Sequence, residues 1–112
     1  MKVGILWYVR SDSLGHDEKI GGRLVQSFFN SIGERLQEPA AFFFMNRGIF
    51  LTLEDSPVLD ALRGLESQGC RILSCGTCLD YFEATDRLAV GSVGSMAILQ
   101  ELMLEAERVV TL

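Results

Sequence analysis

Short apolar runs alternate along the chain with segments whose apolar residues recur at helical spacing. The run from Val3 to Val9 is apolar, as expected of a strand that is buried on both faces of a parallel sheet. From Asp17 onward, apolar residues recur every four positions and so share one face of a helix of about five turns. These residues are Ile20, Leu24, Phe28, Ile32 and Leu36, with Val25 and Phe29 beside them. The first third of the sequence therefore predicts a strand followed by an amphipathic helix.

The same alternation continues through the remaining residues. Further strands are predicted at Ala41 to Met45, Cys70 to Ser74, Leu88 to Val90 and Arg108 to Thr111. Further helices are predicted from Pro57, with Ser56 as the cap and a stop at Gly69, from about Cys78, and from Ser95 to about Glu105. Alternating strands and helices imply right-handed crossovers. Residues 1–112 are therefore predicted to form a single α/β domain, a three-layer α/β/α sandwich around a mainly parallel five-stranded sheet.

In sheets of this kind the carboxyl ends of the strands share one edge, and ligands bind in the crevice there. The segments expected at that edge are Arg10 to Ser13, Asn46 to Gly48, Ser74 to Cys78 and Val93 to Ser95. Residues that carry chemistry are therefore expected in these four segments.

Composition and charge narrow the classes of function. The net charge is −5 and no five-residue window is basic, so binding to nucleic acid is not expected. When glycine is not counted as apolar, the longest apolar run is Ala40 to Met45, which is far shorter than the ~20 residues that span a membrane. The three cysteines are an odd number and no segment resembles a secretory signal, which favours a reducing compartment with free thiols. We therefore expect a cytoplasmic protein.

The strongest chemical signal is the sequence Cys75-Gly76-Thr77-Cys78, which lies where the third strand is expected to pass into a helix. A thiol at a helix N-terminus or in a Cys-x-x-Cys pair can have a pKa well below its usual value, which makes it a nucleophile. Gly76 permits a tight backbone turn, and the hydroxyl of Thr77 is placed to hydrogen-bond to a sulfur atom. The plain alternative is a pair of small buried cysteines that pack as apolar residues.

Three chemistries compete for this pair. A thioredoxin-like dithiol lacks a suitably placed proline, because the two prolines are Pro39 and Pro57, although reversible disulfide formation remains open. A closed zinc site needs four ligands. Cys70 is roughly 16 Å away along a strand that rises ~3.3 Å per residue, and His16 is the only histidine. No metal and no cofactor are therefore predicted within one chain, and sulfur carriage on a cysteine is the remaining chemistry.

Other residues at the same edge are candidates for binding an anionic substrate. Arg10 and Arg47 each follow a strand, where either could hold a thiolate or an anion through charge-assisted hydrogen bonds. The turn that ends at Ser95 opens the last helix, and its free N–H groups could cradle an anion. A solvated arginine and a turn that merely requires glycine are the alternatives.

The block from Leu73 to Tyr81 resembles the signature of the DsrE-like domain of the YedF family, the sulfurtransferase-like selenium metabolism proteins. Other blocks resemble that family in the same order, namely Ser11 to Gly15, Met45 to Thr52, Leu59 to Gly69 and Leu88 to Met96. The resemblance implies a DsrE-type fold, assembly into oligomers, and sulfur carried on Cys75 or Cys78. A TusA-like domain usually precedes this one in the family, so a TusA-like sulfur-carrier protein is an implied partner.

Together these observations predict a sulfur or selenium carrier, with Cys75 or Cys78 as the acceptor and Asn46, Arg47, Gly76 and Thr77 shaping its pocket. Cys78 is expected to have the lower pKa and Cys75 to be the better exposed. The alternative is a non-catalytic, oligomeric binding or assembly subunit in which the two cysteines form a redox lock. Zinc held between two subunits by two such pairs is a third hypothesis.

Overall fold

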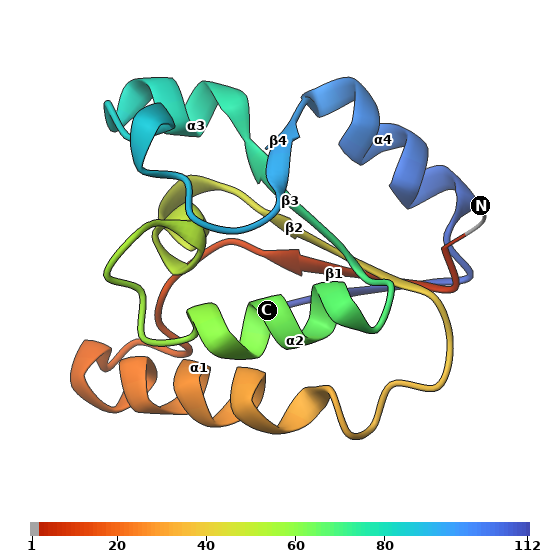
Figure 1. Cartoon of the computed structure of the whole chain (residues 1–112), viewed down its shortest axis with the longest axis horizontal. Helices are drawn as coiled ribbons and strands as arrows, with labels where there is room; N and C mark the ends of the chain where they lie inside the picture. Colours follow the sequence, from red (N-terminus) through yellow and green to blue (C-terminus); the bar gives the residue numbers. More distant parts are fainter. Residues whose placement is uncertain (1–2) are drawn as a thin grey trace.

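The computed structural model describes residues 3–112. Within that range, five parallel strands form one sheet in the order β4-β3-β2-β1-β5 (Figure 1). The strands are β1 (Ile5–Val9), β2 (Ala40–Phe44), β3 (Arg71–Cys75), β4 (Ser92–Gly94) and β5 (Arg108–Thr111). The predicted α/β sandwich with a five-stranded sheet is confirmed, and its strands are all parallel.

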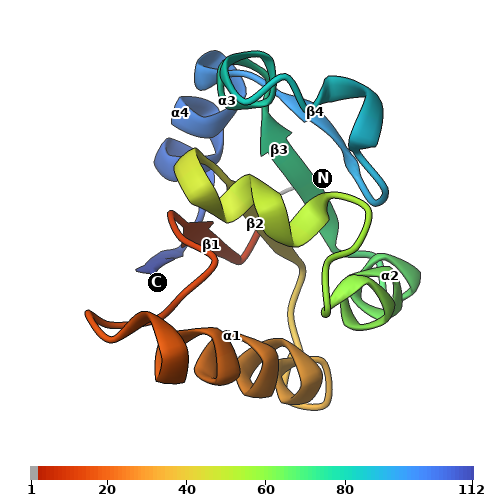
Figure 2. The same ribbon diagram turned by 90° about the vertical axis from the view of Figure 1, so that its left-hand side faces the viewer.

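The helices form the two outer layers. α1 (Glu18–Ile32) and α2 (Leu59–Ser67) cover one face of the sheet, and α4 (Met96–Glu105) covers the other (Figures 1 and 2). Strands β1 to β4 follow one another across the sheet, whereas the connection from β4 to β5 returns over its whole width. Because crossovers keep the same right-handed sense, this reversal places α4 on the face opposite α1 and α2.

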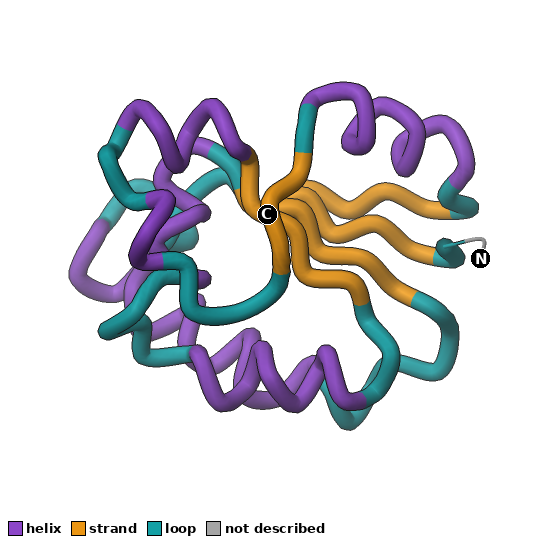
Figure 3. The backbone as a smooth tube through the Cα atoms, turned by 45° about the horizontal axis from the view of Figure 1, so that its top comes forward, coloured by secondary structure: helices purple, strands orange, loops and turns teal. Residues whose placement is uncertain are grey.

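Three short helices lie around the carboxyl ends of the strands. They are α3 (Gly76–Tyr81) and the 3₁₀ helices η1 (Asn46–Thr52) and η2 (Thr85–Arg87). Figure 3 shows the strands converging on the side of the molecule where these helices gather. None of the helices within residues 3–112 has the length and apolar character needed to cross a bilayer.

The core has two parts, one on each face of the sheet, and β2 supplies both. Phe42 and Phe44 pack with Phe29 of α1 on one face, while Phe43 packs with Leu99 of α4 on the other. Successive side chains of a strand point to opposite faces, so three consecutive phenylalanines can fill both cores. All three are fully buried.

The fourth strand was predicted at residues 88–90, and that prediction is wrong. Leu88 instead forms an isolated antiparallel bridge with Leu53, and the N–H of Ala89 donates to the carbonyl of Thr52. Gly91 then turns the chain with a φ of +73°, and a Cβ there would lie 2.3 Å from the carbonyl oxygen of Ile72. Residues 88–90 are thus bonded to the end of η1 instead of joining the sheet. The less apolar β4 forms the edge strand in their place.

Several helix boundaries also differ from the predictions. The first helix ends at Ile32 rather than Leu36, although Leu36 still packs against the core. The second helix begins at Leu59, because the hydroxyl of Ser56 accepts from the N–H of Val58 in a preceding turn. The predicted turn after β2 is the 3₁₀ helix η1, and α3 begins at Gly76 rather than near Cys78. Helix–sheet packing, which local pattern does not reveal, sets these limits.

Candidate functional site

Cys75 and Cys78 are positioned by the junction between β3 and α3. Cys75 is the last residue of β3 and the N-cap of α3, and its Sγ accepts a hydrogen bond from the N–H of Cys78 (3.4 Å). Gly76 lies so close to β4 that a Cβ there would be 3.0 Å from Val93 Cγ1. A glycine is therefore favoured at this junction. The junction itself brings the two thiols together.

The two thiols differ in exposure, in the opposite sense to the prediction. Cys75 is only 4% exposed, whereas Cys78 is partly exposed. The N-cap side chain folds back over the first turn of α3 and packs with the core beneath α4, which buries it. Cys78 is thus the thiol of the pair that solvent can reach.

Cys78 receives a hydrogen bond from a second element. The N–H of Asn46, at the start of η1, donates to Cys78 Sγ at 3.1 Å. β2 and β3 are neighbours in the sheet, so the residues after β2 come to lie beside α3. The sequence prediction that Asn46 and the cysteines share one edge of the sheet matches this arrangement.

The pKa of the Cys78 thiol lies above its ordinary value. Burial raises it most, the N–H of Asn46 partly offsets that effect by favouring the thiolate, and the neighbouring Cys75 thiol adds a further increase. The prediction of a lowered pKa is therefore wrong. A short helix and one amide donor do not outweigh desolvation, so the thiolate fraction of Cys78 grows as the pH rises above neutral.

Arg47 follows Asn46 but contacts other groups. Its guanidinium lies 3.4 Å from the carboxylate of Asp12 and 4.7 Å from the centre of the Phe50 ring. It also lines an open cavity of about 810 Å³ with His16 and residues of the loop after β1. Arg47 therefore lies at the part of the carboxyl edge of the sheet that is close to α1. Its hydrogen bonds do not reach the cysteines.

The remaining predicted residues are spread along the same edge. Arg10 donates through Nε to the carbonyl of Leu112 (3.4 Å), and it follows β1, which is two strands away from β3. Thr77 is exposed on α3. Ser95 is the N-cap of α4, where its hydroxyl accepts from the N–H of Ile98. Its hydroxyl is thus occupied in helix capping.

Sequence reasoning missed two residues that pack against the same core as Cys78, on the α4 side of the sheet. Tyr8 and Met45 are partly buried there, and the Tyr8 hydroxyl donates to the Met45 sulfur. A tyrosine near the end of a buried strand was the available signal, because its hydroxyl needs a partner.

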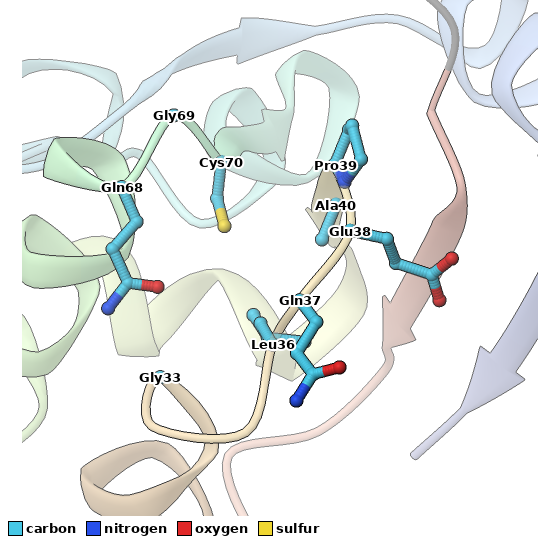
Figure 4. Close-up of a pocket in the computed structure, with 9 residues that line it drawn as sticks. All are labelled: Gly33, Leu36, Gln37, Glu38, Pro39, Ala40, Gln68, Gly69 and Cys70. Carbon is cyan, nitrogen blue, oxygen red and sulfur yellow. The ribbon is translucent and has the colours of Figure 1, made fainter.

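The third cysteine lies at the opposite end of the sheet. Cys70 precedes β3, is buried, and lines a cavity of about 580 Å³ with Gln37 and Gln68 (Figure 4). The predicted separation of Cys70 from the Cys75–Cys78 pair is therefore correct. Burial raises the pKa of the Cys70 thiol, which keeps it protonated. Within residues 3–112, no group of three or more His, Cys, Asp or Glu side chains is arranged to hold a metal ion.

The sequence was compared with known families, and the model of the DsrE/DsrF-like family matches residues 8–112. The chain belongs to the DsrE/DsrF-like family. The predicted DsrE-like domain is thereby confirmed, whereas the assignment to the YedF family stays a prediction. A comparison with curated proteins found no match.

Solved structures similar to this DsrE/DsrF-like chain share its fold. The ychN protein from E. coli is 20% identical with a TM-score of 0.69, and the match covers 98% of this chain and 99% of that one. MTH1491 from Methanobacterium thermoautotrophicum, a protein of unknown function, is 16% identical with a TM-score of 0.72 and the same coverage. BT1422 from Bacteroides thetaiotaomicron, also of unknown function, is 17% identical with a TM-score of 0.63, covering 96% and 94%.

Proposed function

We propose that this DsrE-like protein carries sulfane sulfur as a persulfide on Cys78. The observation that carries the proposal is the arrangement around Cys78 Sγ. This partly exposed thiol lies at the carboxyl edge of the sheet, with an amide donor at 3.1 Å and a second, buried thiol beside it. Membership of the DsrE/DsrF-like family supports a role in sulfur relay.

In the loading step, the Cys78 thiolate attacks the outer sulfur of a donor persulfide. A new S–S bond forms at Cys78 Sγ, the S–S bond of the donor breaks, and the donor leaves as a thiolate. In the delivery step, an acceptor thiolate attacks the outer sulfur and Cys78 leaves as the thiolate. Both steps transfer sulfur without any external oxidant or reductant.

The donor and acceptor we propose are thiol proteins of the TusA-like kind, in a reducing, cytoplasmic compartment. The described cysteines are free thiols, as this chemistry requires. The resemblance of residues 73–81 to the YedF signature supports selenium as a further cargo, bound to the same sulfur atom.

The proposal is tested by incubating the reduced chain with a small-molecule persulfide and measuring its intact mass. We expect a stoichiometric adduct of about 32 Da that is removed by dithiothreitol. Cys70→Ser is the matched control, because it removes a buried thiol remote from the site, and it should load as the wild type does. A wild-type chain that gains no mass under these conditions contradicts the proposal.

A redox lock is the second candidate function, and the contact between the two thiols favours it. In that case an oxidant would join Cys75 to Cys78, the mass would fall by about 2 Da with loss of two hydrogens, and no sulfur would be gained. The same mass spectra therefore distinguish the two functions.

We also propose that the protein forms a homo-oligomer through α4. This helix is apolar on nearly all sides, and its outward residues Met96, Met103 and Leu104 are exposed, the last at 87%. Val109 of β5, also exposed, lies on the same face of the sheet as Leu6 beneath α4. A helix that is apolar all round is usually buried, and exposed apolar patches mark interfaces.

Leu104→Glu is expected to reduce the oligomer to a smaller species, because a charge buried in an apolar interface without a partner is costly. Sedimentation velocity at micromolar concentration measures the change. Ile20→Glu is the matched control, since Ile20 is an exposed apolar residue on the α1 face. A wild-type chain that sediments as a monomer, or equal effects of both substitutions, argues against α4 as the interface.

A further inference from the structure

Asn46 adopts a backbone conformation that most residues avoid. Its φ is +51°, in the left-handed region, while Met45 before it is fully extended with a φ of −144°. Asparagine is several-fold enriched there among non-glycine residues, and a β-branched residue is a genuine outlier. The chain makes this turn where β2 passes into η1, beside the two cysteines.

The Asn46 amide, at the start of this turn, points at a sulfur atom. The N–H of Asn46 donates to Cys78 Sγ at 3.1 Å, while its side-chain Oδ1 accepts from the N–H of Arg47 at 2.9 Å. On either side, the N–H of Met45 donates to the carbonyl of Val9 and the N–H of Gly48 donates to the carbonyl of Met45. The amides around Asn46 are therefore held by neighbouring backbone or by the Asn46 side chain.

A buried polar contact links η1 to the strand that precedes the cysteines. The hydroxyl of Thr52, at the end of η1, lies 2.7 Å from the hydroxyl of Ser74, and both residues are fully buried. Thr52 also donates to the carbonyl of Ile49. Ser74 immediately precedes Cys75, so the contact ties η1 directly to the strand that carries the reactive pair.

We propose that Asn46 is a positioning residue for the reactive thiol, whose left-handed backbone holds its N–H on Cys78 Sγ and stabilises the thiolate in both transfer steps. This inference rests on the proposed function of Cys78. The thiolate forms before loading and again after delivery, so an amide already in place needs no rearrangement at either step.

The other titratable groups near Cys78 do not replace this donor. Cys75, on the same junction, disfavours the thiolate, and the Tyr8 hydroxyl of β1 donates to Met45. The guanidinium of Arg47 in η1 is engaged with Asp12 and Phe50. From α4, the side chains that pack in the same core are the apolar Ile98, Leu99 and Leu102. Compared with these groups, the Asn46 N–H is the one that donates a hydrogen bond to Cys78 Sγ.

The first test needs no substitution in the loop. In the reduced wild-type chain, the amide proton of Asn46 is followed by ¹⁵N–¹H NMR as the pH is raised. We expect its chemical shift to titrate with the same midpoint as the Cys78 thiol, and to lose that transition in Cys78→Ser. An Asn46 resonance that is insensitive to Cys78 ionisation overturns the proposal.

The second test compares two substitutions by the pH profile of Cys78 alkylation with iodoacetamide, in a Cys75→Ser background. Asn46→Gly retains the left-handed backbone and the N–H, and we expect its profile to match the parent. Asn46→Val disfavours that backbone, and we expect the midpoint to rise by about one pH unit, from loss of a hydrogen bond to a charged group. Equal profiles for Val and Gly overturn the proposal. If Asn46→Val fails to fold, the NMR titration decides.

These readouts are independent of sulfur transfer. If the wild type gains no persulfide but its Asn46 amide titrates with Cys78, the proposed function fails and the positioning role stands. If the wild type loads normally and the amide does not respond, the positioning role alone fails.

Discussion

Cys78→Ser is expected to abolish persulfide loading, whereas Cys75→Ser should retain it. The physical reason is access, because Cys75 is 4% exposed beneath α4 and Cys78 is the thiol that solvent reaches. A hydroxyl at position 78 is too weak a nucleophile at neutral pH to take sulfur from a donor. Intact mass spectrometry of each reduced variant, after equal exposure to a persulfide donor, measures the loss directly.

The lifetime of the adduct gives a second measure in the same experiment. Cys75 can attack Cys78 Sγ in the persulfide, forming the Cys75–Cys78 disulfide and releasing HS⁻. Cys75→Ser removes that attack, so its adduct should persist longer than that of the wild type. An adduct that survives in Cys78→Ser and disappears in Cys75→Ser would assign carriage to the buried thiol, against our proposal.

Phe42→Ala is expected to cause the largest loss of stability among single core substitutions, about 3–5 kcal/mol in the free energy of unfolding. Phe42 is fully buried at the centre of the sheet, where its ring stacks on Trp7 with 5.9 Å between ring centres and also contacts Phe29. Removing the ring leaves a cavity that flanking strands cannot close. The loss is a large part of the ~5–15 kcal/mol that such a domain has.

Urea denaturation under reducing conditions, followed by far-UV circular dichroism, measures this change. Tyr81→Ala is the matched control, because Tyr81 is an aromatic residue that is 79% exposed. Its effect should stay within about 0.5 kcal/mol. A loss below about 1 kcal/mol for Phe42→Ala would mean that the core tolerates the missing ring, contrary to the packing described for β2.

Much of the fold could be predicted because its signals are local. The apolar strands β1, β2 and β3 are buried on both faces, and the apolar spacing of α1 is long and regular. Ile20 and Leu24 of that spacing are nevertheless exposed, and α1 buries Val25 and Phe29 beside them. β4 could not be predicted, since Ser92 and Val93 are exposed at the edge of the sheet and carry no apolar signal. The more apolar residues 88–90 are held instead by a bridge to Leu53, a contact between distant segments that no local pattern encodes.

The location of the candidate site was predictable for a different reason. Parallel strands bring their carboxyl ends to one edge, which places Asn46 beside the Cys75–Cys78 pair whatever the loops do in detail. The relative exposure of the thiols was not predictable, because it depends on which cysteine caps α3. The direction of the Arg47 side chain was not predictable either. Its guanidinium contacts Asp12 and Phe50 because Arg47 lies in η1, where the sequence predicted only a turn.

The strand order also has a consequence for how the chain folds. Neighbouring strands in this sheet are never joined by a hairpin, and Ile5 pairs with Arg108, which is about a hundred residues away in the sequence. Such long-range pairing is slow, because chain entropy is lost before contacts compensate for it. Cys70 and Cys75 are therefore unprotected until most of the molecule has assembled. A reductant must accompany folding from denaturant, so that premature disulfides do not trap the chain.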